Sequence, residues 1–245
     1  MSFLGIDRRQ AGILADRYLD ILLGDFFGTA ILLIQAPLIA GAIAGVWSNL
    51  SSDSLSLYFV LCLSAFFLGA VNASREIVKE RAMFLREKMF NLSVGAYLAS
   101  KYRVQAILVL IQCVTLAAMV QNWVPLKINL VAVTAILILT ALSGTAVGLL
   151  VSSWVKSNDK AVALVPLLVI PQILFSDFVV GQGKLANWTA DAQKAMPVYW
   201  GYEVLRELRE TEVDAWPVIL GMLVLGGMIA ICFLSALVRL RSARY

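Results

Sequence analysis

The sequence predicts an all-α membrane protein with six transmembrane helices, an N-terminal amphipathic connecting helix, a charged cytoplasmic helix and an outer re-entrant or interfacial helix. Of the 245 residues, 60% are hydrophobic and 15% are charged, and the mean hydropathy is +0.84. The charged residues leave long uncharged runs close to the length of about 20 residues that a membrane-spanning helix needs. This composition leaves little of the chain for a soluble domain.

The first predicted element, residues 1–24, is an amphipathic helix that lies along the inner membrane surface. Leu14 and Tyr18 fall on its apolar face, and Arg9, Arg17 and Asp20 fall on its polar face. No short apolar core stands before a small-residue cleavage site in this region, so we expect no cleaved signal peptide.

Uncharged runs predict five of the six spans. They lie between Asp25 and Asp53, Asp53 and Arg75, Arg103 and Lys127, Lys127 and Lys156, and Asp214 and Arg239. The remaining run, residues 161–176, contains Pro166 and Pro171. Proline bends a helix, and a membrane tolerates this where neighbours satisfy the freed backbone groups. We therefore expect a bent fifth span that continues past Asp177.

These spans predict a single transmembrane domain over residues 1–245. Residues 25–180 hold spans one to five, residues 181–216 form the outer segment, and residues 217–245 form the last span and a tail. Six spans place both termini on one side of the membrane, and 15 of the 20 Lys and Arg residues fall on that side. Basic residues concentrate on the cytoplasmic side. We therefore expect a multi-pass plasma-membrane protein, most simply of a bacterial inner membrane, with both termini in the cytoplasm.

Residues 74–90, SREIVKERAMFLREKMF, are the charged segment, with three Glu and five Lys or Arg between the second and third spans. Charged side chains are costly at mid-membrane, so this segment lies at the cytoplasmic surface. Wound as one helix, it has a basic line, an acidic line and two apolar strips. The basic line contains Arg75, Lys79 and Arg86, and the acidic line contains Glu76, Glu80 and Glu87. One apolar strip contains Val78, Leu85 and Met89, and the other contains Ile77 and Phe84.

Two interpretations of the charged segment remain open at this point. It is either an interfacial helix with solvated charges, or a coupling helix whose apolar strips dock on the spans while its charged lines face a soluble partner.

Residues 197–208, PVYWGYEVLREL, predict a short outer helix with Pro197 in its first turn. Tyr199 and Trp200 suit the lipid headgroup level. The charged residues from Glu203 onward are expected to face water.

Several absences narrow the function. The sequence contains no His and no G-x-x-x-x-G-K-[ST] nucleotide loop, so we expect no metal site, no catalytic residue and no ATPase activity in this chain. A net charge of +4 does not indicate nucleic-acid binding. Most spans have almost no ionisable residue near their centres, which an ion-coupled carrier usually needs. The energy for any transport is therefore expected from a partner.

Four stretches resemble a known family. SREIVKERAMFLREKMFNLSVGAYLASK is similar to the first cytoplasmic loop of ATP-binding-cassette (ABC) exporter permeases of the G-subfamily, type-2 kind. RYLDILLGDFFGTAILLIQAPLIA resembles that family's connecting helix and first span, PLLVIPQILFSDFVV its fifth span, and AMPVYWGYEVL its outer re-entrant segment. The match is to a permease domain without an attached ATPase.

The resemblance implies an exporter permease that works as a homodimer, or as a pair with a close relative, in contact with membrane lipids. Two copies of a separate ABC ATPase would bind ATP and Mg, and this chain would bind no cofactor. The resemblance places the ATPase contact at Glu76, Lys79, Glu80, Arg81, Arg86 and Glu87.

The resemblance also implies a substrate cavity between two permeases and an outer gate. Candidates for the cavity are Leu61, Ala65, Leu68 and Asn72 on the second span and Val165, Val169 and Leu174 on the fifth, although lipid-facing or helix-packing roles fit them equally. Candidates for the gate are Asp177, Tyr199, Trp200 and Glu203. Asp177 replaces a usual small residue and Tyr199 a usual basic residue, which puts the family's gate chemistry in doubt.

The apolar cavity candidates point to a lipid-like or amphipathic substrate. Two rival functions stay open: a secondary carrier or channel that is not coupled to ATP, and a membrane scaffold that anchors a soluble partner.

Overall fold

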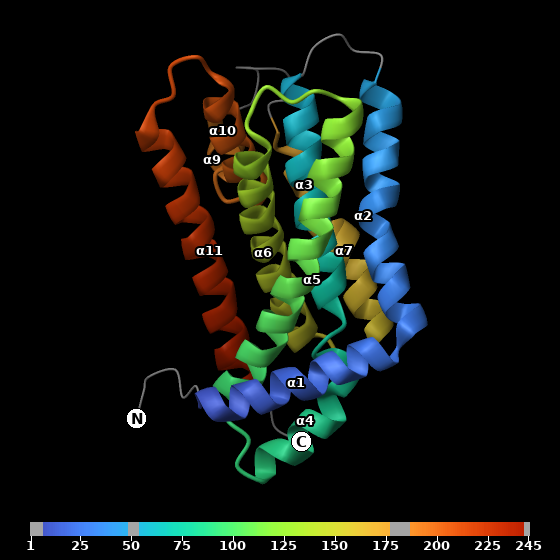
Figure 1. The fold of residues 1–245 in the computed structure, drawn as a ribbon. Coiled ribbons are helices and arrows are strands. Elements are labelled where there is room, and N and C mark those ends of the chain that lie inside the picture. The colour runs from blue at the N-terminus through green and yellow to red at the C-terminus, as the bar shows by residue number, and fades with distance from the viewer. Residues whose placement is uncertain (1–6, 49–53, 177–186, 243–245) are drawn as a thin grey trace.

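The protein folds as a bundle of long helices with one helix, α1, lying across its end (Figure 1). The computed structural model describes residues 7–48, 54–176 and 187–242. All regular elements within these residues are helical. They are α1 (Arg8–Gly24), α2 (Phe26–Trp47), α3 (Leu55–Ser74), the 3-10 turn η1 (Val78–Glu80), α4 (Arg81–Met89), α5 (Val94–Trp123), α6 (Leu130–Trp154), α7 (Asn158–Leu174), α9 (Asn187–Gln193), α10 (Pro197–Arg209) and α11 (Ala215–Ser242).

Five helical segments in the described residues are long and apolar enough to cross a membrane, and they correspond to α2, α3, α5, α6 and α11. The prediction of an all-α membrane protein is confirmed. The predicted fifth span is α7, which contains Pro166 and Pro171 and is 17 residues long. At 1.5 Å per residue it covers about 25 Å, less than the ~30 Å of a bilayer's hydrocarbon core. Its continuation past Asp177 falls outside the described residues, so the fifth span, and with it the total of six, stays a prediction.

α1 and α2 meet at a sharp corner at Asp25, and an aspartate caps the start of each helix. The Asp7 carboxylate accepts hydrogen bonds from the backbone N–H groups of Arg9 and Gln10, at 2.9 and 3.2 Å, and so caps the start of α1. The Asp25 carboxylate caps α2 in the same way by accepting from the Gly28 N–H at 3.0 Å. α1 thus lies across the bundle and α2 runs along it (Figure 1). We call this end of the bundle the α1 end, and the opposite end the α10 end.

The close crossing of α3 and α6 forms the centre of the bundle. A side chain on Gly69 of α3 or on Gly144 of α6 would collide with a backbone carbonyl of the facing helix. A Cβ on Gly148 would lie 2.7 Å from the Ala70 carbonyl oxygen. Small residues at such positions let two membrane helices approach closely, which gains van der Waals contact where no hydrophobic force acts between helices.

The predicted outer helix is α10, and Pro197 stands in its first turn as expected. The helix packs between α3, α6 and α11 at the α10 end. Its buried face includes Val198, Gly201 and Leu205. The Val198 N–H donates to the Gln172 side-chain oxygen at 3.1 Å, so the start of α10 is fixed to α7.

Candidate functional site

The charged segment is not one helix, which corrects the helical-wheel expectation. α3 ends at Ser74, a turn follows, and the chain continues as η1 and α4. The Ser152 hydroxyl of α6 accepts the backbone N–H groups of both Ile77 and Val78 at 3.0 Å. In a continuous helix those N–H groups would donate hydrogen bonds to backbone carbonyls of the preceding turn. A side chain 74 or 75 positions away in the sequence therefore interrupts the helix.

Glu76 turns inward from this break and is 5% exposed. Its carboxylate accepts a hydrogen bond from the Tyr18 hydroxyl of α1 and one of 2.6 Å from the Lys79 ammonium. The Gln105 amide of α5 donates to the same Tyr18 oxygen at 2.8 Å. Burial and the neighbouring Glu76 carboxylate raise the pKa of Tyr18 well above its ordinary value. The phenol therefore stays protonated and keeps donating to Glu76.

Lys101 of α5 joins the two inner carboxylates. Its side chain is 3% exposed, and its ammonium lies 2.7 Å from a Glu80 carboxylate oxygen and 3.9 Å from one of Glu76. The ammonium also stands 3.6 Å from the centre of the Tyr18 ring, where the face of an aromatic ring attracts a cation. One buried lysine thus links η1 and the preceding turn to both α5 and α1.

Glu87 of α4 binds α1 directly. Two nitrogens of the Arg17 guanidinium donate to the two Glu87 oxygens at 2.8 and 3.4 Å. This hydrogen bond raises the pKa of Arg17 above its ordinary value. A guanidinium matches a carboxylate in this two-point geometry, so the contact fixes the orientation of α4 against α1.

The expectation that the acidic line faces a soluble partner is therefore wrong for Glu76 and Glu80, and Glu87 is half-buried against α1. A buried carboxylate needs a cation and hydrogen-bond donors. Lys101 of α5 supplies the cation, Tyr18 of α1 donates to Glu76, and Arg17 of α1 pairs with Glu87. The sequence carried one signal, Lys101, a cation about two turns into the helix of the third span and just before its uncharged run.

The basic residues of the segment divide between anchoring and exposure. Arg81 donates to the Val155 carbonyl at the end of α6 at 3.1 Å. The Lys88 ammonium donates to the carbonyls of Leu240 and Arg241 at 3.0 and 2.8 Å, where the last carbonyls of α11 lack helical partners. Arg75, Lys79 and Arg86 are exposed.

The apolar strips dock only in part. Ile77 and Phe84 are each 1% exposed, and the Phe84 ring packs on the Tyr97 ring of α5 at 4.7 Å between centroids. Met89, which was expected to dock on the spans, is 64% exposed, and Phe90 beside it is 80% exposed.

The charged segment therefore presents a free tip to its surroundings. Arg86 and Phe90 line a shallow recess of about 240 Å³ there, together with Gln10, Glu87 and Leu92. Met89 and Phe90 are adjacent and exposed, and an apolar patch rimmed by charged groups is the kind of surface feature that marks a protein contact.

The cavity candidates on α3 lie inside the chain's own core. Leu61, Ala65 and Leu68 are 0% exposed, because the face of α3 that carries them packs in the bundle core. Asn72 is 3% exposed and donates to the Gln112 side-chain oxygen at 2.7 Å. In this conformation the four side chains pack between helices, as the helix-packing alternative expects, and their role as cavity lining stays a prediction. The half-exposed stripe of α3 consists instead of Val60, Leu63, Ser64, Phe67 and Val71.

The three candidates on α7 divide between the core and the surface. Val165 is 2% exposed and belongs to the core. Val169 is half-buried and packs against that core. Leu174 is 54% exposed, so it alone of the three presents most of its side chain outside the bundle.

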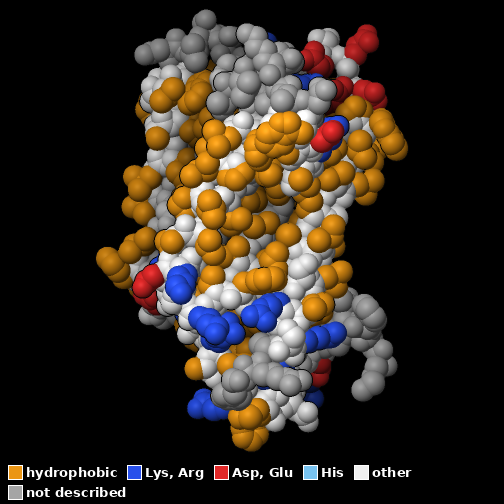
Figure 2. Space-filling view, turned by 180° about the vertical axis from the view of Figure 1, so that it is seen from behind, with side chains coloured by type: hydrophobic (Ala, Val, Ile, Leu, Met, Phe, Trp, Pro, Cys, Tyr) orange, Lys and Arg blue, Asp and Glu red, His pale blue; other side chains and the backbone are white. Residues whose placement is uncertain are grey.

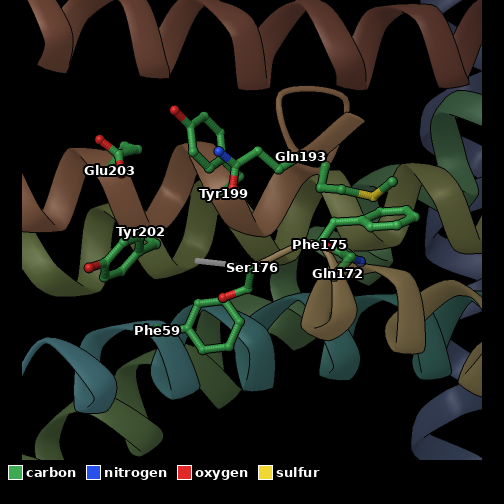
Figure 3. A pocket seen from close by; sticks show the side chains of 9 residues that line it. Phe59, Gln172, Phe175, Ser176, Gln193, Tyr199, Tyr202 and Glu203 are labelled. Atoms are coloured by element: carbon green, nitrogen blue, oxygen red, sulfur yellow. The ribbon is translucent and has the colours of Figure 1, made fainter. Parts of the chain in front are cut away.

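Two of the four outer-gate candidates, Tyr199 and Glu203, line a small pocket at the α10 end. Tyr202 of α10 and Phe59 of α3 also line it (Figure 3). Its volume is about 20 Å³, room for about one water molecule. Trp200 does not line the pocket, and its indole N–H donates to the Lys194 carbonyl at 2.7 Å. Asp177 falls outside the described residues.

The model of the ABC-2 type transporter family matches residues 9–209. A curated relative, an ABC transporter ATP-binding/permease protein of Mycobacterium tuberculosis, is 26% identical over 188 residues. The match covers 69% of this chain and 22% of that relative, so the chain corresponds to about a fifth of the relative's length. The family match covers most of the chain, including α1, the charged segment and α10. The protein is therefore a membrane permease of the ABC-2 type transporter family.

Proposed function

We propose that this chain is the permease subunit of an ABC exporter and that ATP hydrolysis in two separate ABC ATPase subunits drives it through the charged segment. One observation carries this proposal: the segment has an exposed tip and is bound on its other sides to α1, α5, α6 and α11. ATP and Mg would bind to the partner, in keeping with the "ATP-binding/permease" description of the relative.

The contacts of the charged segment connect it to four helices of the permease. Glu87 binds α1, Glu80 binds Lys101 of α5, and Arg81 and Ser152 join the segment to α6. Lys88 binds the end of α11. A displacement of the tip therefore acts on four helices at once, because side chains in a packed, hydrogen-bonded cluster do not move independently.

In this proposal the predicted coupling residues divide into two groups. Arg86 contacts the ATPase, and Met89 and Phe90 supply apolar surface for the same contact. Glu76, Lys79, Glu80, Arg81 and Glu87 position the segment on the helices of the permease.

The wider assembly follows the same proposal. A second permease copy, or a close relative, packs against the exposed apolar faces of α2 and α7, where Leu38 and Leu167 are 65% and 63% exposed. A lipid-like or amphipathic substrate passes outward between the copies. The α1 end faces the cytoplasm of a bacterial cell, because most basic residues lie there.

Co-expression of the full chain with the ABC ATPase encoded nearest to it tests the coupling. We expect the two to purify together and to hydrolyse ATP. Phe90→Asp should reduce ATPase retention about tenfold or more, since the contact would lose a buried aromatic side chain. The matched control is Lys194→Glu, an exposed charge at the α10 end, which should retain the ATPase at the wild-type level.

Three results would reject the proposal. The first is the absence of any ATPase that binds the chain. The second is substrate transport by the chain alone in liposomes, as a secondary carrier or channel predicts. The third is ATPase binding without ATP-dependent transport, as a membrane scaffold predicts.

A further inference from the structure

A recess of about 420 Å³ opens at the corner between α1 and α2, separate from the tip of the charged segment. The end of α3 and the start of α7 close its other sides. Its polar lining includes Arg75, Lys79, Asp25 and Asn158, and its apolar lining includes Ile31 and Leu32. This volume falls in the range of small-molecule sites, which is about 300–1,000 Å³.

Arg75 is the unmatched charge of this recess. Glu76 at its edge is matched by Lys79 and hydrogen-bonded by Tyr18, and the Asp25 carboxylate caps α2. Within residues 7–48, 54–176 and 187–242, the side chain of Arg75 makes no hydrogen bond or ion pair, and it is exposed. A guanidinium in such a position is suited to bind the oxygens of a phosphate.

The recess lies at the level where the membrane-spanning surface begins. Phe26 and Phe27, directly after the corner, are 81% and 76% exposed, as expected of side chains that contact lipid. Figure 2 shows Lys and Arg side chains gathered at the α1 end of one face, with a largely hydrophobic surface above them. A ligand that combines a phosphate with apolar chains fits both parts of this surface.

We propose that the recess binds the phosphate headgroup of an anionic phospholipid from the leaflet at the α1 end. Arg75 contacts the phosphate, and Ile31 and Leu32 contact the start of the acyl chains. The site holds lipid beside α1, α2 and the start of the charged segment. The proposal does not depend on an ATPase partner.

Native mass spectrometry of the detergent-solubilised full chain tests the site with dioleoylphosphatidylglycerol as the probe. The wild type should retain the lipid. Arg75→Gln should weaken binding about tenfold, the size expected for loss of a charged hydrogen bond, and Arg75→Lys should restore part of it. Lys160→Gln removes an exposed cation at the same end that does not line the recess, and it should bind like the wild type.

Two further probes identify the source of the phosphate. Dioleoylglycerol, which has the same chains without the phosphate, should bind at least about tenfold more weakly than the phospholipid. Inorganic phosphate should not displace the lipid at equal concentration. Equal binding of dioleoylglycerol, displacement by inorganic phosphate, unchanged binding by Arg75→Gln, or an equal loss in Lys160→Gln would each overturn the proposal. Circular dichroism of Arg75→Gln and Arg75→Lys confirms that loss of binding is not loss of fold.

Discussion

Lys101 is the residue on which the inner side of the charged segment depends. Its ammonium lies 2.7 Å from Glu80 and 3.9 Å from Glu76 and close to the face of the Tyr18 ring. Lys79 also pairs with Glu76, but Glu80 depends on Lys101, and a buried carboxylate that loses its cation is strongly destabilising. Lys101 therefore holds the inner side of the segment, while Arg17, Ser152 and the end of α11 hold its other sides.

Lys101→Met should destabilise the purified chain by about 3–5 kcal/mol, because it leaves two buried carboxylates without this cation. Thermal unfolding in detergent measures the effect. Lys160→Met, which changes an exposed lysine, should leave the unfolding temperature unchanged. Adding Glu80→Gln to Lys101→Met should recover part of the loss, since one uncompensated charge disappears. If the double variant is no more stable than Lys101→Met alone, the ion pair is not what holds the segment.

At the scale of the element, the sequence predicted most helices and missed how one of them breaks. Asp25 and Pro197 are residue types that favour helix starts, and the charged residues at the two ends of each apolar run indicate the spans. The interruption after Ser74 arises from Ser152, and the Glu87 contact arises from Arg17, 70 positions away in the sequence. A helical wheel contains only neighbours in the sequence, so it could place Glu76 and Glu80 on one line but could not show that line facing Lys101.

The same limit applies to the cavity candidates. Leu61, Ala65 and Leu68 are apolar residues on a membrane helix, and nothing in their identity distinguishes a cavity wall from a helix contact. The glycines at the α3–α6 crossing explain why these residues form helix contacts in this structure. They draw the two helices together and turn that side of α3 inward.

The α3–α6 crossing predicts a clear difference between two glycine substitutions. Gly144→Ala should destabilise the chain by about 1–3 kcal/mol, because its Cβ collides with the backbone of α3. Gly226→Ala in α11 meets no atom within 4 Å and should leave stability unchanged or slightly higher. Thermal unfolding of the two variants in the same detergent provides the comparison. Equal unfolding temperatures would contradict the close approach of α3 and α6.

At the scale of the whole molecule, α1 and the charged segment behave as one unit at the α1 end. The Arg17–Glu87 pair joins them, and its side chains are 40% and 27% exposed. A pair this exposed contributes only about 0–1 kcal/mol to stability. Its effect is therefore expected in the relative position of α1 and α4, and so in coupling, more than in the unfolding temperature.

Exchange of the two charges separates this role from a direct contact with the ATPase. Arg17→Glu and Glu87→Arg should each lower ATP-dependent transport by the assembled complex, because like charges then push α4 away from α1. The double variant Arg17→Glu with Glu87→Arg should regain at least about half of the wild-type rate, since the attraction is restored. The Asp191–Lys194 pair at the α10 end, 3.1 Å apart and more exposed, is the matched control, and its exchange should leave transport unchanged. A double variant as defective as Glu87→Arg alone would show that Glu87 contacts the partner itself, because restoring its bond to α1 would then have no benefit.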